Sequence, residues 1–194
     1  MAIRQIRIWP DPALSEVAKP VETFDKELET LVSDMFETMY KANGVGLAAT
    51  QIAVPSRVLI IDLDPQEDAK TEADIARELE SFGFKGPQEF INPEIIKAEG
   101  EITWEEGCLS VPGYTENVRR KANIRVRAFN RHGEEFTIDC RGLYSVALQH
   151  EMDHLDGRVF VEYLSKLKKD VVKRKMSRLK LNGTTDGVEA ALQL

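Results

Sequence analysis

The chain has 194 residues, 42% of them hydrophobic, and a formal net charge of −7, so it is long enough for one globular domain with a sizeable core. Its amino terminus, MAIRQIRIWPDPAL, lacks the apolar run of a signal peptide, and no stretch reaches the roughly eighteen apolar residues of a membrane span. Two cysteines are too few for a disulfide scaffold. We therefore expect a cytoplasmic protein with reduced thiols, whose partners include neither membrane nor DNA.

The spacing of apolar residues predicts helices at both ends of an α+β domain. A stripe formed by Leu28, Leu31, Val32, Met35 and Met39 predicts a helix over 25–42 that ends at Asn43-Gly44. Runs rich in β-branched residues then predict the strands 57–63, 90–96, 123–129 and 135–139, the last two as a hairpin. A second helix is predicted over 143–156 and is stopped by Gly157.

Two segments lie outside this pattern. Residues 64–88 are polar, and their simplest interpretation is a solvated loop rather than a substrate lid, with a short helix opening at Thr71 as an option. Residues 166–180, KLKKDVVKRKMSRLK, carry a net charge of +7, which leaves −14 on the rest of the chain. An apolar stripe of Leu164, Leu167, Val171 and Val172 predicts a helix docked through one face. Its charge fits either a solvated face or an RNA contact, for example with the ribosome.

The sequence QHEMDHLDG at 149–157 carries a metal-binding pattern. His150 and His154 are four residues apart, so on a helix both imidazoles reach one ion. Glu151 lies beside the first ligand, close enough to take a proton from metal-bound water. A solvated, charged helix face is the alternative, but two of the three histidines of the chain fall in this pattern.

A catalytic metal needs a third protein ligand and one open position. The extended pattern of some metallopeptidases would place a histidine where this chain has Phe160. His132 lies between two strand-like runs and is expected in a hairpin turn, and Cys140 suits a half-buried strand position. Cys108 differs, because WEEGCLSVPG is bracketed by glycine and proline and must bend. A thiolate there would complete a Cys-His-His set.

The segment NGVGLAATQI, residues 43–52, combines small residues with one amide, Gln51. Its glycines and alanines allow another backbone to approach closely. A helix C-terminus followed by a tight connection explains the segment equally well.

Taken together, GVGLAATQI, EEGCLSVPG and QHEMDHLDG resemble, in this order, the three signature motifs of the peptide deformylase family, and the resemblance spans about residues 3–165. It implies a hydrolase that removes the formyl group from the formyl-methionine of nascent polypeptides. It also implies one divalent metal ion per chain, Fe²⁺ in cells, with Zn²⁺, Ni²⁺ or Co²⁺ able to substitute. The fold that we expect has mixed or antiparallel sheets packed around a central metal-binding helix, with an N-terminal and a C-terminal helix.

The resemblance also assigns roles to individual residues. Metal ligands would be Cys108, His150 and His154, with Glu151 as general acid and base. Gln51 and the backbone N–H of Leu109 would form the oxyanion hole. The remaining residues would line the substrate site: Val45, Gly46, Glu106, Leu143, Val146 and Ala147. Some members hold the peptide with an arginine just past the cysteine motif, where this chain has Gly113-Tyr114-Thr115.

These assignments divide the chain into a catalytic domain over 1–165, a basic C-terminal helix over 166–182 and a disordered tail over 183–194. The partners implied are formyl-methionyl nascent peptides, and the ribosome through residues 166–180. Two other functions compete with this one. A general zinc endopeptidase would need the missing histidine at Phe160, and a structural metal site would need a fourth protein ligand.

Overall fold

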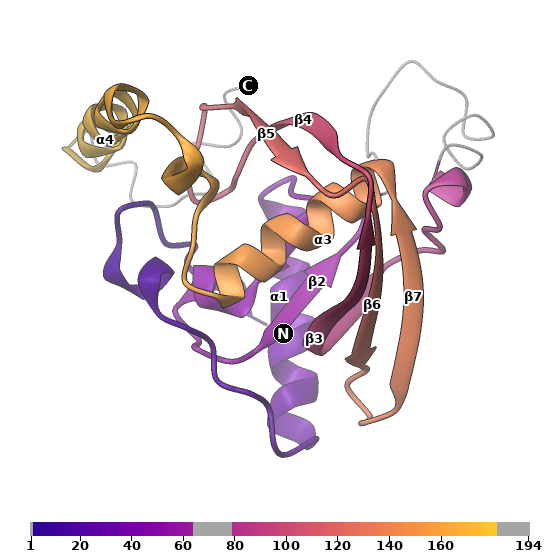
Figure 1. Ribbon diagram of the computed structural model, residues 1–194. Coiled ribbons are helices and arrows are strands. Elements are labelled where there is room, and N and C mark those ends of the chain that lie inside the picture. Colours follow the sequence, from indigo (N-terminus) through magenta and orange to yellow (C-terminus); the bar gives the residue numbers. More distant parts are fainter. Residues whose placement is uncertain (1, 64–78, 182–194) are drawn as a thin grey trace.

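A computed structural model describes residues 2–63 and 79–181 of the chain (Figure 1). A five-stranded sheet has the order β1-β2-β3-β6-β7, and β4 and β5 form a second sheet of two strands. All strand pairs in both sheets are antiparallel. The strands are β1 Gly46–Ala48, β2 Val58–Ile61, β3 Gln88–Glu99, β4 Ile102–Glu106, β5 Glu116–Arg120, β6 Asn123–Phe129 and β7 Glu135–Arg141. The helices are α1 Lys26–Lys41, α3 Gly142–Leu155 and α4 Lys166–Leu181, with 3-10 turns at Pro12–Ser15, Ala49–Ile52 and Phe160–Tyr163.

Helix α1 confirms the prediction for 25–42 to within one residue at each end. Its start is fixed by Asp25, whose carboxylate accepts hydrogen bonds from the backbone N–H groups of Glu27 and Leu28. The buried stripe of the helix packs with Leu47, Val58 and Ile60 in one of three apolar clusters. Burial of this stripe is what holds α1 against the large sheet.

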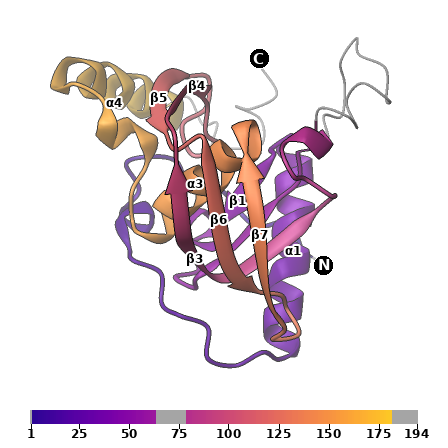
Figure 2. The ribbon, with the colours of Figure 1, turned by 45° about the vertical axis from the view of Figure 1, so that its right-hand side comes forward.

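Helix α3 is the centre of the molecule, as the sequence predicts. It runs across one face of the large sheet, and the β4–β5 pair lies beyond it (Figures 1 and 2). Tyr144, Leu148 and Leu155 are buried with the sheet residues Leu59, Ile61 and Val126. Because α3 contacts both sheets, its two histidines lie between them and out of bulk water.

The predicted strands are all present, but three further strands escaped prediction. Strand β1 is only three residues long and lies in a run of glycine and alanine, which favours no secondary structure strongly. Strands β4 and β5, with sequences ITWEE and ENVRR, are short and rich in charged residues. Their pairing, Trp104 opposite Val118, depends on register and not on local composition.

The interpretation of 64–88 as a solvated loop is wrong for the apolar residues near its end. Phe84 is only 5% exposed and packs edge-to-face on Tyr144, with ring centres 5.4 Å apart. Leu79 and Phe82 pack against the same cluster. The polar average over the segment concealed these three apolar residues. Residues 64–78, including Thr71, lie outside the described part of the chain.

Helix α4 forms where the basic segment predicts it; it packs against the 3-10 turn Phe160–Tyr163 and reaches the first residue of β5 through Lys168. Val172 and Met176 are fully buried with Val111 and Phe160. The predicted apolar stripe is wrong in part, because Leu167 is 73% exposed and Val171 is 48% exposed. The docked face is thus centred on Val172 and Met176. The proposed tail, 183–194, lies outside the described residues.

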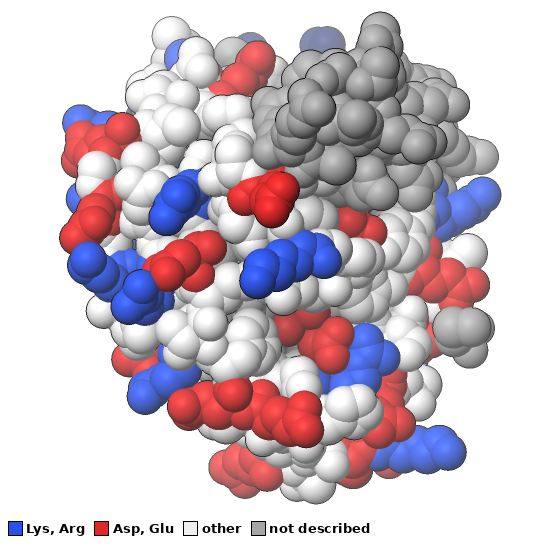
Figure 3. Space-filling model, turned by 90° about the vertical axis from the view of Figure 1, so that its right-hand side faces the viewer, with Lys and Arg blue, Asp and Glu red and all other residues white. Residues whose placement is uncertain are grey.

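The face of the molecule shown in Figure 3 carries both signs of charge, intermingled over its surface. On the sheet, Arg125 pairs with Asp139 at 2.7 Å and Arg127 pairs with Glu94 at 2.5 Å. Mixed charge of this kind creates no extended field of one sign. None of the helices described here combines the length and the apolar character needed to cross a bilayer.

Candidate metal centre

The structure brings together the three predicted metal ligands. Cys108 lies in the loop after β4, and His150 and His154 lie one turn apart on α3. The donor atoms of these three side chains are all within 4.8 Å of one another. The Cys108 Sγ is 3.2 Å from the His154 Nε2, and both histidines are buried. Cys108, which is 42 and 46 positions away from the two histidines in the chain, is therefore brought to them by the packing of the β4 loop on α3.

The chemistry of this donor set fits a single metal ion. The Nδ1 atom of His150 is 2.8 Å from Glu106, so this nitrogen donates and Nε2 keeps its lone pair for a metal. His154 directs Nε2 at the sulfur, and its buried Nδ1 has no partner within the described residues. One thiolate and two imidazoles leave a fourth tetrahedral position open. The described residues contain no other group of three or more such side chains.

Burial and neighbouring charge act in opposite directions on the two histidines. Burial alone lowers the pKa of His150, but the adjacent Cys108 thiolate and the Glu106 carboxylate raise it well above its usual value. Burial and the charge of His150 together lower the pKa of His154 far below its usual value. Without a metal, therefore, a proton would favour His150. Metal binding requires neutral imidazoles and must displace that proton.

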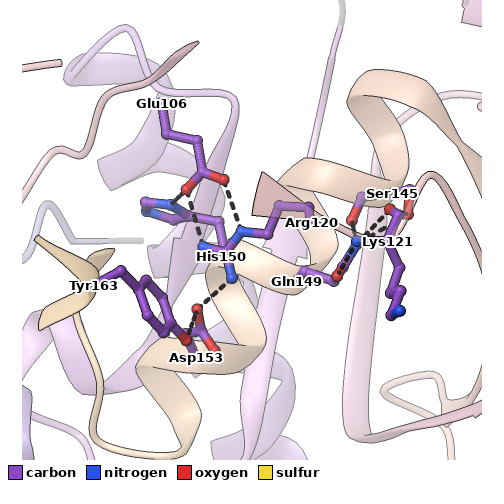
Figure 4. Close-up of polar contacts among 8 residues, drawn as sticks. All are labelled: Glu106, Arg120, Lys121, Ser145, Gln149, His150, Asp153 and Tyr163. Atoms are coloured by element: carbon purple, nitrogen blue, oxygen red, sulfur yellow. Dashed lines mark hydrogen bonds and ion pairs between the residues drawn. The ribbon is translucent and has the colours of Figure 1, made fainter. Parts of the chain in front are cut away.

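Glu106 and Arg120 hold His150 in place (Figure 4). Two nitrogens of the buried Arg120 donate to Glu106 at 2.7 Å and 2.9 Å, and a third donates to Asp153 at 2.5 Å. The Tyr163 hydroxyl donates to Asp153 at 2.9 Å, and the Arg120 guanidinium lies 5.4 Å from the centre of the Tyr163 ring. Burial would raise the pKa of Glu106, but Arg120 and His150 lower it. Glu106 is therefore ionised and fixes the orientation of the His150 ring.

Further polar contacts anchor the first half of α3. Figure 4 shows the Gln149 side chain against Ser145 and Lys121. Its Nε2 donates to the Lys121 carbonyl at 2.9 Å, and the Lys121 N–H donates to its Oε1 at 3.0 Å. These bonds tie the helix to the turn between β5 and β6. The position of His150, one residue further along, is thereby fixed.

Glu151 is buried beside the donor cluster. Its Oε2 has no hydrogen-bond partner among the residues that the structure describes. Burial raises the pKa of Glu151 to about 7, although His150 lowers it. The carboxylate lies so close to β1 that a Cβ atom on Gly46 would come within 2.5 Å of its Oε1. Glycine at position 46 therefore provides the space that Glu151 occupies.

Gln51 directs its amide nitrogen toward the loop that carries Cys108 and Ser110. Its Oε1 accepts a hydrogen bond from the Ala48 N–H at 2.8 Å, which fixes the amide orientation. Its Nε2 lies 3.2 Å from the Ser110 Oγ and 3.6 Å from the Cys108 sulfur. The Leu109 side chain packs against Gly44, where a Cβ atom would come within 2.6 Å of it. Small residues at 44 and 46 thus leave room for the side chains of Leu109 and Glu151, whereas the sequence predicts another backbone there.

A cavity of about 310 Å³ opens over this cluster and contains every predicted substrate-site residue. Val45 and Gly46 line it beside β1, and Glu106 and Leu109 line it from the segment at the end of β4. Leu143, Val146 and Ala147 of α3 also line the cavity. Sequence reasoning missed Trp104 and Tyr114 in the lining, and Arg120 and Asp153 behind it. Arg120 comes two residues after Val118, so in a strand both side chains point to the same, buried face. This spacing could have identified Arg120 as a buried arginine.

The residues that the sequence argued against lie away from the cluster. His132 is 62% exposed at the turn between β6 and β7, which confirms its placement in a hairpin. Cys140 is fully buried in the sheet cluster, and this burial raises the pKa of its thiol to about 12. Neither residue belongs to the donor group.

Comparison with known proteins gives one consistent result. The family model for polypeptide deformylase matches residues 3–170. Peptide deformylase 1 of Burkholderia multivorans is 49% identical over 180 residues, which cover 92% of this chain and 90% of that protein. A crystal structure of a peptide deformylase from Legionella pneumophila is 44% identical with a TM-score of 0.80, over 92% of this chain and 96% of that one. The Ehrlichia chaffeensis peptide deformylase in complex with actinonin is 36% identical with a TM-score of 0.82, over 95% of this chain and 100% of that one.

Proposed function

This chain belongs to the polypeptide deformylase family, and we propose that Glu151, Gln51 and Leu109 carry out its reaction. As a member, it is a hydrolase that removes the formyl group from the formyl-methionine at the start of nascent polypeptides. One observation supports the roles of its residues above all others. Cys108, His150, Glu151 and Gln51, from three separate segments, line the same cavity.

Cys108, His150 and His154 would hold the metal ion, which we propose is Fe²⁺, with Zn²⁺, Ni²⁺ or Co²⁺ able to take its place. When bound, the ion would polarise the formyl oxygen and activate a water molecule at neutral pH. A thiolate with two imidazoles suits these metals better than magnesium or calcium. Anaerobic purification followed by metal analysis tests this choice. Activity that is full and stable in air with zinc as purified would overturn the preference for iron.

Glu151 would accept a proton within the cavity and return it to the departing amine. Its Oε2, which has no partner within residues 2–63 and 79–181, can make this contact, and a pKa of about 7 suits both directions of proton transfer. We expect Glu151→Gln to lose turnover on formyl-Met-Ala-Ser and to retain its metal, because Glu151 is not a ligand. Loss of metal equal to that of His150→Ala would contradict this role.

The amide of Gln51 and the backbone N–H of Leu109 would stabilise the negative charge that develops on the formyl oxygen. The hydrogen bond from Ala48 keeps the Gln51 amide oriented before the substrate arrives. Such prior orientation is what makes an oxyanion donor effective, and removing one typically costs about 10²–10³ in rate. Gln51→Leu, which cannot donate, tests this assignment.

The peptide would lie along the free edge of β1. Among the strands that the structure describes, β1 is at the edge of the large sheet and pairs with β2 alone, so an extended chain can add beside Val45 and Gly46. The methionine side chain would enter the part of the cavity lined by Leu143, Val146 and Ala147, where Val146 and Ala147 are buried. The Glu106 carboxylate is hydrogen-bonded to Arg120 and His150, so Glu106 would line this part of the cavity without binding the substrate through its charge.

A matched pair of cysteine variants separates the third ligand from the core thiol. Cobalt-loaded wild-type protein should show a thiolate-to-metal charge-transfer band. We expect the band to vanish in Cys108→Ser and to persist in Cys140→Ala, because Cys140 lies in the sheet core. The reverse pattern would refute the proposed ligand set.

The two competing functions lack support in the cavity. A structural metal site requires a fourth protein ligand, and the donor group found within the described residues contains three. The position where an endopeptidase would need a histidine is Phe160, which is buried against apolar residues.

We further propose that α4 directs the enzyme to ribosomes in the cytoplasm. Lys173, Arg174 and Arg178 line one shallow depression on this helix, together with Asp170 and Ser177, so its net charge is positive. Several phosphate contacts would make binding strongly salt-dependent. Changing these three residues to glutamate should abolish cosedimentation with ribosomes at low salt and preserve turnover of a short formyl-peptide. Unchanged cosedimentation would leave α4 with a solvated basic face.

A further inference from the structure

Tyr114 lines the cavity, together with its neighbours Gly113 and Thr115. Its ring stacks on Phe160 at an angle of 18°, with ring centres 6.3 Å apart. Phe160 in turn lies 6.0 Å from the His150 ring. Tyr114 is therefore one aromatic ring removed from the metal ligands, and it is half-buried rather than enclosed.

The hydroxyl of Tyr114 is occupied by a contact that leads away from the cavity. It donates to the Glu116 Oε2 at 3.1 Å, and the Lys168 Nζ donates to the same oxygen at 2.7 Å. Lys168 belongs to α4, and Glu116 is the first residue of β5. Helix α4 thus fixes the Glu116 carboxylate through Lys168, and this carboxylate in turn fixes the Tyr114 hydroxyl.

A second contact from α4 fixes the backbone on the other side of Tyr114. The Lys175 Nζ donates to the Gly113 carbonyl oxygen. Gly113 has a φ of +64°, a left-handed conformation that glycine adopts without strain. Val172, between the two lysines in the sequence, and Met176, directly after the second, are fully buried in the cluster against which Tyr114 packs. The position of Tyr114 therefore depends on the docking of α4.

This arrangement determines what Tyr114 can offer a ligand. With its hydroxyl engaged by Glu116 and one face covered by Phe160, the remaining face and edge of the ring are apolar surface. Trp104 adds a second aromatic side chain to the same cavity. A cation at this place would favour a carboxylate or a carbonyl oxygen, whereas an aromatic ring favours apolar and aromatic side chains.

Extended peptide advances about 3.3 Å per residue. The ring-centre distances of 6.3 Å and 6.0 Å put the Tyr114 ring no more than about 12 Å from the His150 ring. The second and third residues of a substrate whose formyl group lies at the metal ligands fall within that span. We propose that Tyr114 is a specificity-determining residue that contacts an apolar side chain at one of these two positions, and that Lys168 is a positioning residue for it. This inference rests on the proposed function.

The test compares peptides that differ at one position only. The substrates are formyl-Met-Xaa-Ser and formyl-Met-Ser-Xaa, with Xaa either phenylalanine or serine. We expect the wild type to have a higher kcat/KM for phenylalanine at one position. Tyr114→Leu should reduce that preference about 3- to 10-fold, mainly through KM, which is the size of one aromatic contact. Tyr114→Phe keeps the ring and should retain more of the preference, and it serves if the leucine variant folds poorly.

Variants of α4 test the positioning role. Lys168→Met should reduce the phenylalanine preference in the same direction, and Lys168→Arg should restore it, because arginine can still donate to Glu116. The neighbouring Lys169→Met is the matched control and should keep the wild-type preference. A Lys168→Met protein with a lower melting temperature and an unchanged preference would overturn the positioning role.

The outcomes also separate this inference from the proposed function. If the wild type hydrolyses no formyl-peptide, the proposed function fails. If it hydrolyses all of the peptides and Tyr114→Leu leaves their ratios unchanged, or lowers all rates equally, only the inference about Tyr114 fails.

Discussion

A single methyl group at position 46 should separate catalysis from metal binding. In Gly46→Ala, the new Cβ would lie 2.5 Å from the Oε1 and 3.0 Å from the Cδ and Cγ of Glu151. Ordinary contact begins at about 3.4 Å, so the carboxylate must move by about 0.9 Å. Position 46 lies in β1, where extended backbone accepts alanine, so the perturbation falls on the side chain. A displacement of about 1 Å of a catalytic group can cost about 100-fold in rate, or about 2.7 kcal/mol in activation free energy.

We expect kcat for formyl-Met-Ala-Ser to fall about 100-fold in Gly46→Ala, with wild-type metal content. Steady-state kinetics and metal analysis on the same preparation measure both quantities. Gly107→Ala is the control within the same cavity, since its Cβ would meet only the Thr115 Cγ2 at 3.5 Å. Wild-type kcat in Gly46→Ala would refute the placement of Glu151, and loss of metal would show that the methyl group disturbs the ligands.

Three further predictions concern the support of the site and the docking of α4. Glu106→Gln should lower metal affinity about 10- to 100-fold and reduce the free energy of unfolding, because Arg120 and His150 lose their anionic partner. Metal competition measures the affinity and urea unfolding measures the stability. An unchanged metal affinity would contradict the reasoning. Burial would raise the pKa of Asp34, but the Ala2 N–H and the Arg4 guanidinium lower it below its usual value. The ionised Asp34 therefore stabilises the fold fully above about pH 4, and this stabilisation is lost as the pH falls through the folded-state pKa. Thermal unfolding of wild type and Asp34→Asn should therefore differ at neutral pH and converge in acid; a constant difference would argue against a charge effect. Met176→Ala should lower the free energy of unfolding by about 2–5 kcal/mol, because Met176 is fully buried. Leu167→Ala, at an exposed position of the same helix, should lower it by less than about 0.5 kcal/mol. Equal losses would show that α4 is not docked through this face.

The local features of the chain could be predicted from its sequence. Helix α1 begins and ends within one residue of its predicted bounds, because Asp25 caps it and the apolar spacing is regular. The hairpin around His132 follows from two strand-like runs separated by a turn. The pairing of His150 with His154 required only the periodicity of a helix.

The cluster around these histidines could be predicted only in part. Cys108 is separated from His154 by 46 residues, and the bent, glycine-bracketed loop favoured it without fixing its position. Resemblance to a family, and not spacing, assigned Gln51 and Leu109. The folded chain then brings Cys108, Gln51 and Glu151 to one cavity.

What only the tertiary structure decided are the contacts that hold this cavity in shape. Glu106 meets His150 across 44 residues, and Lys168 meets Glu116 across 52. Contacts at such separations depend on strand register and on which face of a helix docks, as the mixed outcome for the α4 stripe shows. The sequence by itself determined the pair His150 and His154, because residues four apart on a helix lie on the same face and no distant contact is needed to bring them together. The setting of that pair arises from packing between distant segments, which no local pattern encodes.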